Sequence, residues 1–483
     1  MDAEDSAYYD AYTSRDPRFD GVFFIGVTST NIYCRPVCPA KTPAKKNCRF
    51  LVSAAAAEKE AFRPCLRCRP ELAPGNAPMD DAHRIAELIV RRIEEGTIDG
   101  GAKLEDIASQ FELSSRQLRR IVQKELGVSP IELLRTRRLL LAKQLLTETA
   151  LSITEIAFAS GFSSLRRFND AFVGRYRLAP SKLRRAVLDG VKMPAADVSS
   201  IRLSYRAPFD WQGLLSFLEL RALKNAEWVG NDFYCRTIRL GNHTGWIRVR
   251  DTADKRALHL EFTNSLAPAL PALIGRLRNL FDLSARPDVI ADCLIEDPII
   301  GSAISANPGL RVPGAFDGFE LAMRAVLGQQ VSVKAATTLA GRLTSAFGEE
   351  IETPFAELSR LSPKAERIAA LSVDEIASLG IVGARAKTII ALAQAVASGK
   401  LNLEAGAHPE NTIARLTAIP GIGAWTAHYI AMRGLRWTDA FPKTDLVLRK
   451  NLGGVSANIA EEMSQAWRPW RSYAVLHIWN SAG

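Results

Sequence analysis

The sequence has no apolar run of roughly eighteen residues, so we expect no segment that crosses a lipid bilayer. The stretch from Met1 to Asp20 is polar and acidic and lacks the apolar core of a secretory signal peptide. No low-complexity tract is present either. We therefore expect a cytoplasmic protein without a membrane partner. Thiols stay reduced there, so clustered cysteines indicate a metal site or catalysis rather than disulfides.

The chain is too long for one hydrophobic core, because 483 residues at roughly 100–200 per domain correspond to three or four domains. Its hydrophobic content of 47% and charged content of 24% are ordinary for globular proteins. Basic residues outnumber acidic ones and give a net charge of +10. That excess favours a polyanionic partner, although charge alone does not specify nucleic acid.

Four of the seven cysteines form two close pairs, Cys34 with Cys38 and Cys65 with Cys68. Two such pairs can supply four thiolates to one tetrahedral Zn²⁺. The surrounding segment is proline-rich and has little apolar core, so metal ligation would stabilise its fold directly. A zinc-bound thiol is deprotonated, and the thiolate is the nucleophilic form. The pattern alone fits a purely structural zinc site as well as a reactive one.

The residues around these cysteines resemble the N-terminal domain of the Ada family over about residues 5–75. The resemblance rests on two strings, Ile32-Tyr33-Cys34-Arg35-Pro36 with Cys38, and Phe62-Arg63-Pro64-Cys65-Leu66-Arg67-Cys68-Arg69-Pro70. It implies that the four cysteines bind one Zn²⁺ and that Cys34 irreversibly accepts a methyl group from a methylated DNA phosphate. Methylating one of four thiolates reduces the negative charge of the site, so we expect tighter DNA binding afterwards. Arg35 and Arg67 are among the candidate phosphate contacts, although for each residue singly a solvated surface position is the favoured alternative.

Amphipathic helical patterns continue from about Asp81 to Arg185. One helix begins at Leu104, and Ser114 is placed to cap the next. A connecting helix over 135–146 leads to another pair that begins at Ile153. Two helix-turn-helix units joined by a helix resemble the AraC-type DNA-binding domain, which implies binding to promoter DNA and contact with RNA polymerase. A helical bundle without DNA is the alternative. The side chains suited to base edges or phosphates in the major groove are Arg116, Gln117, Arg119, Arg166, Arg167 and Asn169.

The sequence character changes after this region. From Ala186 to Ser200 the helical pattern weakens, which indicates a linker. Alternating apolar residues then predict strands over Thr244 to Arg250 and Ala257 to Thr263. From about Phe316 onward the pattern is helical and is punctuated by Gly and Pro.

A tight hairpin between two helices is predicted at Pro420-Gly421-Ile422-Gly423, where glycines let backbone amides approach a phosphate. Such a turn alone is weak evidence, because many non-enzymes contain it. Here Phe441-Pro442-Lys443-Thr444-Asp445 follows about twenty residues later. Together these features resemble the helix-hairpin-helix glycosylase superfamily. The closer match is the AlkA family of 3-methyladenine DNA glycosylases, from Phe209 to the chain end.

This resemblance implies that Asp445 is the catalytic aspartate. Breaking an N-glycosidic bond builds positive charge on the deoxyribose, which a carboxylate beside C1′ stabilises. The alternative is that Asp445 only caps the helix Leu446 to Lys450. Family members that also cut the backbone carry a lysine where this chain has Trp425. We therefore expect a monofunctional enzyme that leaves an abasic site.

Alkylated purines such as 3-methyladenine and 7-methylguanine are cationic, and an electron-rich aromatic pocket attracts them. Each aromatic could instead be ordinary core. Gln330 stands where the family has a leucine wedge, and Leu446 and Asn480 replace family aromatics, which leaves the substrate range open. Backbone carbonyls of the hairpin at Gly421 and Gly423 could hold a monovalent cation. The residues that match aromatic positions of the family pocket are Phe217, Trp425, Tyr429 and Trp479.

We expect a multidomain, mainly α chain with α+β parts that acts as a monomer on double-stranded DNA, both damaged and promoter. Its expected function is DNA alkylation repair and the regulation of that repair. The Pro-Cys-His-Arg string of a second Ada-type methyltransferase is absent, so direct O6-methylguanine repair is not expected. Two alternatives are a regulator with an inactive glycosylase half and a glycosylase for oxidised bases. The expected domains are an Ada-like zinc methyl-acceptor domain (1–78), an AraC-type domain (79–186), a linker (187–200), an AlkA-like N-terminal α/β domain (201–290) and a helix-hairpin-helix glycosylase domain (291–483).

Overall fold

The computed structural model forms two compact units, residues 1–91 with 102–133, and 92–101 with 134–483. The helix expected at Leu104 lies outside the described residues, apart from Glu105 and Ala108. Within the described parts of the chain, no helix has the length and apolar character that crossing a bilayer requires. Apart from a few isolated positions between 86 and 108, the structure describes residues 3–15, 19–20, 23–51, 54–70, 113–188, 197–405 and 407–481.

A four-stranded sheet in the order β3-β1-β2-β4 organises the N-terminal part of the first unit. Strand β1 pairs antiparallel with β2 and β3, while β2 and β4 run parallel. Gly26 is required in β1, because a Cβ there would lie 2.7 Å from the Phe62 ring. The elements are α1 (Ala3–Ser14), β1 (Phe24–Val27), β2 (Ile32–Cys34), η2 (Lys45–Asn47), β3 (Cys48–Leu51), α2 (Ala54–Lys59) and β4 (Arg63–Pro64).

The helix α5 (Ser115–Leu126) begins at the predicted cap. The Ser114 hydroxyl accepts from the Gln117 backbone N–H, and the Gln117 side chain accepts from the Ser114 backbone N–H. This reciprocal capping satisfies two donors at the helix start. Gly127 ends the helix in the left-handed conformation, with φ of +72°. The prediction that Ser114 caps this helix is confirmed.

The predicted second helix-turn-helix unit is present as four helices. Ser152 and Glu155 form a capping box at the start of α7. Phe162, Phe168 and Phe172 are buried in contact with one another and form the core of this unit. The helices are α6 (Pro130–Glu148), α7 (Ile153–Ala159), α8 (Leu165–Tyr176) and α9 (Pro180–Leu188).

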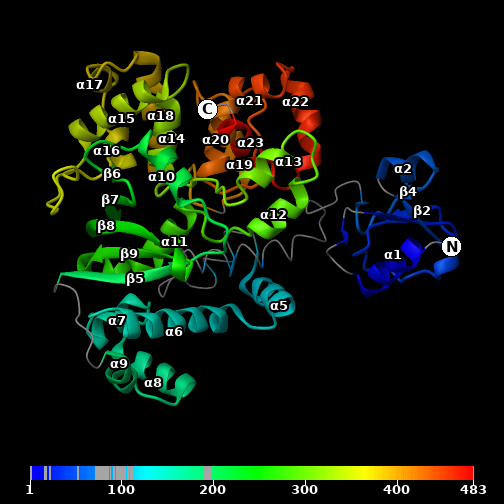
Figure 1. Ribbon diagram of the computed structural model, residues 1–483, viewed down its shortest axis with the longest axis horizontal. Coiled ribbons are helices and arrows are strands. Elements are labelled where there is room, and N and C mark those ends of the chain that lie inside the picture. Colours follow the sequence, from blue (N-terminus) through cyan, green and yellow to red (C-terminus); the bar gives the residue numbers. More distant parts are fainter. Residues whose placement is uncertain are drawn as a thin grey trace. The chain divides into compact units, whose positions relative to one another are not determined.

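A five-stranded antiparallel sheet in the order β5-β9-β8-β7-β6 follows, with β5 and β6 at its edges (Figure 1). The two strands predicted from alternation are present as β8 and β9. Helix α9 ends at Leu188 and β5 begins at Val198, both inside the predicted linker 187–200. The elements of this part are β5 (Val198–Ser204), α10 (Trp211–Glu219), β6 (Glu227–Val229), β7 (Phe233–Leu240), β8 (His243–Thr252), η5 (Ala253–Lys255), β9 (Ala257–Thr263), η6 (Asn264–Ala269) and α11 (Leu270–Leu280).

Side chains of α6 cover the outer edge of β5. The Arg202 backbone N–H donates to Glu148 Oε2 at 2.8 Å, and Gln144 Nε2 donates to the Arg202 carbonyl at 2.7 Å. The Arg202 guanidinium also pairs with Glu148 at 3.1 Å. Edge strands otherwise carry backbone donors and acceptors without strand partners. One continuous hydrophobic cluster joins these helices to the sheet.

The rest of the chain is helical and has two hydrophobic cores. Helix α20 contributes to both, with Ala427 and Ile430 in one and Ala431 and Met432 in the other. Tyr429, in the middle of this helix, packs against both cores. The elements are α12 (Pro287–Leu294), α13 (Gly301–Ala306), α14 (Gly318–Leu327), α15 (Val333–Phe347), α16 (Ala365–Ala369), α17 (Val373–Ala377), α18 (Gly383–Ala397), α19 (Pro409–Thr417), α20 (Ala424–Arg433), α21 (Leu446–Asn451), α22 (Ala457–Met463), η7 (Ser464–Trp467) and α23 (Arg471–Asn480).

Candidate functional site

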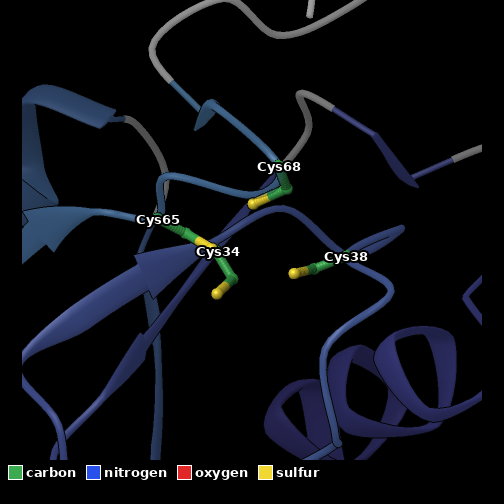
Figure 2. Close-up of side chains that lie close together, drawn as sticks. All are labelled: Cys34, Cys38, Cys65 and Cys68. Carbon is green, nitrogen blue, oxygen red and sulfur yellow. The ribbon is translucent and has the colours of Figure 1, made fainter. Parts of the chain in front are cut away.

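The four predicted cysteines form one buried cluster in the first unit (Figure 2). Cys34 ends β2, Cys38 lies in the loop that follows, and Cys65 and Cys68 come directly after β4. Their sulfur atoms all lie within 4.8 Å of one another. A tetrahedral zinc ion with bonds of about 2.3 Å places its sulfur ligands roughly 3.8 Å apart. The cluster therefore fits the size and the geometry of a four-thiolate zinc site.

Charge in the cluster also fits a bound cation. Hydrogen bonds to Cys38 and Cys68, together with burial, raise the pKa of the Cys34 thiol well above its usual value. Hydrogen bonding by the Cys34 and Cys68 thiols lowers the pKa of Cys38 to about 2. Without a cation, burial and the neighbouring thiols thus disfavour the thiolate form of Cys34. A divalent cation offsets the charge of four thiolates and lets all of them deprotonate.

Arg35 supports this cluster instead of binding phosphate. Its side chain is fully buried and pairs with Asp20. Its backbone N–H donates to Cys68 Sγ at 3.5 Å, and its Nη1 donates to the Cys68 carbonyl at 3.4 Å. Neither the phosphate contact nor the solvated surface position expected for Arg35 is correct, because its guanidinium does not reach the surface. Arg67 is exposed.

Tyr12 is a residue of the cysteine cluster that sequence reasoning missed. It is 1% exposed, and burial together with the neighbouring cysteines, Cys34 first, raises its pKa. Tyr12 belongs to α1, and the sequence carries no signal for this contact because it depends on how α1 packs on the sheet. Tyr12 packs with the four cysteines in one cluster of buried residues.

Removing the metal is expected to unfold the cysteine-containing part of the first unit while the second unit stays folded. Zinc ligation contributes on the order of 10 kcal/mol to the folding of such small domains. All eight tryptophans lie between Trp211 and Trp479, so their fluorescence reports only the second unit. After chelation, hydrogen exchange over Phe24–Val27 should rise strongly, while the tryptophan unfolding curve stays the same. Unchanged exchange in β1 would show that the fold does not depend on metal.

The two predicted sets of DNA-contacting residues are largely exposed. Arg116 and Arg119 are exposed on α5, whereas the Gln117 side chain is engaged in the cap of that helix. On α8, Arg166 and Arg167 are exposed and the Arg166 side chain is 92% accessible. The positions suit contacts with DNA, and a DNA-binding role for these residues stays a prediction.

A cavity of about 680 Å³ lies in the second unit among α10, α14, α20, α21 and α23. All four predicted pocket aromatics line it. The rings of Trp425 and Tyr429 stack, with 5.3 Å between their centroids and 11° between their planes. The ring centroids of Tyr429 and Trp479 are 6.4 Å apart. Phe217 lines the cavity from α10. Flat aromatic walls of this kind suit a planar, base-sized ligand.

Asp445 lines the same cavity and also caps α21. Its Oδ1 accepts from the Leu448 backbone N–H at 2.7 Å and from Trp479 Nε1 at 3.1 Å, and its Oδ2 accepts from Trp425 Nε1 at 2.7 Å. The helix-cap interpretation and the catalytic interpretation of Asp445 are therefore compatible. The three donors fix the orientation of a carboxylate that is only 9% exposed.

Asp439, the other nearby carboxylate, is tied up in ion pairs. It binds Arg471 at 2.7 Å and Arg468 at 2.6 Å. Both of its oxygens thus face guanidinium groups, and Asp439 does not line the cavity. Asp445 is the carboxylate among the described cavity-lining residues.

Arginines at one end of the cavity were missed by sequence reasoning. Arg221 and Arg433 place their guanidinium carbons 3.8 and 4.8 Å from the Phe217 ring centroid. Arg433 donates to the Tyr429 hydroxyl at 2.6 Å. Although burial opposes the change, Arg433 and Arg221 lower the pKa of Tyr429. The sequence did carry a signal for Arg221, because this residue follows Phe217 by about one helical turn. Arg324, also in the lining, pairs with Glu227.

Leu446 and Asn480, which replace family aromatics, differ in their position relative to the cavity. Asn480 lines the cavity, whereas Leu446 is 77% exposed and its neighbour Val447 takes part in the lining instead. Helix α21 starts at Leu446, and its second residue faces the cavity. Asn480 therefore bears on ligand choice more directly than Leu446 does.

The hairpin and the expected wedge loop lie on the surface beside the cavity. Gly421 has φ of +92°, and a Cβ there would lie 2.2 Å from Thr388 Oγ1, so glycine is required. Gly423 caps α20 and is exposed. Gln330 is exposed with φ of +55°, and its neighbours Gly328 and Val331 line the cavity.

Four family models match successive parts of the chain. They describe the metal binding domain of Ada (residues 7–71), a helix-turn-helix domain (107–186), the AlkA N-terminal domain (200–317) and the HhH-GPD superfamily of base excision DNA repair proteins (323–470). The predicted multidomain fold and the zinc-binding cysteine cluster are thereby confirmed.

A relative in Mycobacterium tuberculosis, described as a probable bifunctional transcriptional activator/DNA repair enzyme AlkA, is 38% identical over 481 residues, which cover 98% of this chain and 95% of the relative. This chain belongs to that AlkA family of bifunctional proteins. The Escherichia coli DNA-3-methyladenine glycosylase 2 is 34% identical over 281 residues, 58% of this chain and 97% of that protein.

A solved 3-methyladenine DNA-glycosylase from Archaeoglobus fulgidus shares the fold of the repair part of this AlkA-family chain. The TM-score is 0.52 at 20% identity, and the match covers 58% of this chain and 97% of that structure. The expectation of DNA repair joined to transcription regulation is confirmed at the level of the family, as are glycosylase and zinc-binding modules in one chain.

Proposed function

We propose that the second unit is a monofunctional DNA glycosylase that releases alkylated bases of the 3-methyladenine and 7-methylguanine type. We propose also that Cys34 accepts a methyl group from DNA methylphosphotriesters and thereby activates transcription. The observation that carries the first proposal is the Asp445 carboxylate, held by Trp425 and Trp479 in an aromatic cavity. The similarity to DNA-3-methyladenine glycosylase 2 supports the choice of substrate.

The proposed reaction begins with a damaged base that is flipped into the cavity. A cationic base stacks against Trp425 and Tyr429, where aromatic faces favour positive charge. The bond between C1′ and the base nitrogen breaks, and its electron pair leaves with the base, which becomes neutral. Asp445 stabilises the positive charge that develops on the sugar. Water then attacks C1′, and the carboxylate accepts its proton.

The electrostatic potential differs between the two ends of the cavity. Arg221 and Arg433 disfavour a positive charge near Phe217, while Asp445 favours one near Trp425. A cationic purine therefore binds with its charged edge toward Asp445. In this orientation the scissile bond of a flipped nucleotide would lie beside the carboxylate.

Base release without strand cleavage is expected from the parent protein. Trp425 cannot form the Schiff base through which lysine-containing relatives cut the backbone. Methylated duplex DNA should release 3-methyladenine into solution, borohydride should trap no covalent protein–DNA complex, and strands should break only after alkali. Release of 8-oxoguanine without 3-methyladenine would instead indicate a glycosylase for oxidised bases, and borohydride trapping would contradict the monofunctional assignment.

For methyl transfer, the Cys34 sulfur attacks the methyl carbon of a phosphotriester. A sulfur–carbon bond forms, the carbon–oxygen bond breaks, and a phosphodiester anion leaves. A zinc ion held by Cys34, Cys38, Cys65 and Cys68 would keep the Cys34 thiol deprotonated. The methylated sulfur is neutral, which lowers the negative charge of the cluster and its repulsion of DNA phosphates.

We propose, in addition, that the protein acts in the cytoplasm as a monomer and that its promoter-bound form engages RNA polymerase. The helix-turn-helix match over residues 107–186 supports promoter binding, and the description of the Mycobacterium tuberculosis relative as a transcriptional activator supports contact with polymerase. The role of a monovalent cation at the hairpin carbonyls also remains a proposal.

A further inference from the structure

We propose that Gln329 and Arg385 are positioning residues for base flipping, because they fix the wedge loop of Gln330 against the hairpin at Gly421. This inference rests on the proposed glycosylase function. Neither residue needs to touch the damaged base. Their task is to keep the wedge at a set distance from the backbone amides that hold a DNA phosphate.

Gln329 connects the two DNA-facing loops through its side chain. Its Nε2 donates to the Gly421 carbonyl at 2.9 Å and to Thr426 Oγ1 at 3.0 Å. Gly421 lies in the hairpin, and Thr426 lies in the first turn of α20. The residue that precedes the wedge is thus attached directly to the hairpin and to the helix that carries Trp425.

Helix α18 donates hydrogen bonds to both the wedge loop and the hairpin. Arg385 Nη2 donates to the Gln329 carbonyl at 2.7 Å, and Thr388 Oγ1 donates to the Pro420 carbonyl at 2.9 Å. Arg385 and Thr388 are three residues apart and so lie on the same face of the helix. One turn of α18 therefore fixes the wedge loop and the hairpin relative to each other.

The conformation of the wedge loop requires such support. Gln330 has φ of +55°, a left-handed backbone conformation that residues other than glycine and asparagine rarely adopt. Such an unfavourable backbone conformation persists only where contacts with the surrounding structure hold it in place. Gln330 is exposed, and Val331 and Val333 beside it are 38% and 44% exposed. Two exposed valines thus follow an exposed polar side chain, which is available to enter a base stack.

Flipping requires the phosphate grip and the wedge at the same time. The hairpin holds the backbone beside the lesion, and the wedge fills the space that the extruded base leaves. If the distance between them varies, the wedge no longer reaches that space, while the chemistry at Asp445 is unaffected. Loss of Gln329 or Arg385 should therefore act on extrusion and not on bond cleavage.

The test compares one lesion in two settings with the full-length protein. A 7-methylguanine is placed opposite cytosine, or opposite an abasic-site analogue so that no base pair has to open. With Gln329→Leu or Arg385→Met, single-turnover release opposite cytosine should fall on the order of tenfold, as expected for the loss of one or two hydrogen bonds. Release opposite the analogue should fall less than about twofold. Fluorescence of 2-aminopurine beside the lesion should report less extrusion.

Gln394→Leu is the matched control, because Gln394 is exposed on the same helix α18. It should leave both rates unchanged. Tryptophan fluorescence monitors folding of the variants. Equal losses on both substrates would overturn the inference and indicate general disruption, and no loss on either would overturn it as well. If the parent releases no base, the proposed function fails, while the 2-aminopurine signal still tests the positioning role.

Discussion

An Asp445→Asn variant is expected to lose about 10²–10³-fold in the rate of base release while it keeps its fold. Asparagine is a good N-cap, so the bond to the Leu448 backbone N–H can persist and α21 remains capped. The negative charge beside C1′ is lost, however. With the amide oxygen at the cap, the new N–H₂ replaces Oδ2 and faces the indole N–H of Trp425, where two donors meet without an acceptor.

The measurement is single-turnover release of 3-methyladenine together with the unfolding temperature. Asp439→Asn serves as the matched control, since Asp439 is equally buried but binds Arg468 and Arg471. That variant should lose stability and keep its rate per folded molecule. An Asp445→Asn protein with the parental rate would remove Asp445 from catalysis and leave the regulator with an inactive repair half as the better description.

A Cys34→Ser variant is expected to take up no methyl group, whereas the parent takes up one per chain. A hydroxyl at this position is neither a thiolate nor a good zinc ligand, so the nucleophile disappears. The measurement is peptide mass after incubation with DNA that carries labelled methylphosphotriesters. Methylated parent protein should also bind promoter DNA more tightly than unmethylated protein, because the charge of its cysteine cluster is less negative.

Cys48→Ser is the matched control for methyl transfer. Cys48 is half-buried near the cluster and lies outside the group of four ligands. This variant should bind zinc and accept methyl as the parent does. A methyl group found on Cys38 or Cys65 in the parent would reassign the acceptor, and a parent without any methyl would leave a purely structural zinc site.

Local patterns predicted much of the fold and of the site. The strands β8 and β9 follow from alternation, because one face of each is buried, and the cap at Ser114 follows from its side-chain chemistry. The cysteine cluster followed from the spacing of two close pairs as well as from a family resemblance, whereas the cavity aromatics came from resemblance alone. The structure brings the members of each group together.

What the sequence could not predict depends on contacts between distant segments. Arg35 is buried by Asp20 and Cys68, and nothing in its immediate sequence separates it from the exposed Arg67. Tyr12 reaches the cysteines only because α1 packs on the sheet. The basic end of the cavity arises where Arg221, after α10, meets Arg433 of α20, and no local pattern indicates that proximity.

The covered edge of β5 affects how this protein divides into independent parts. Gln144 and Glu148 belong by sequence to the regulator, yet they satisfy the backbone of Arg202 in the repair half. A repair half isolated at Val198 would present an open strand to other copies of itself, which is a route to intermolecular sheet formation. In this chain, a cut just before Val198 would therefore remove the two side chains that cover the β5 edge, although the cut falls where the family likeness changes.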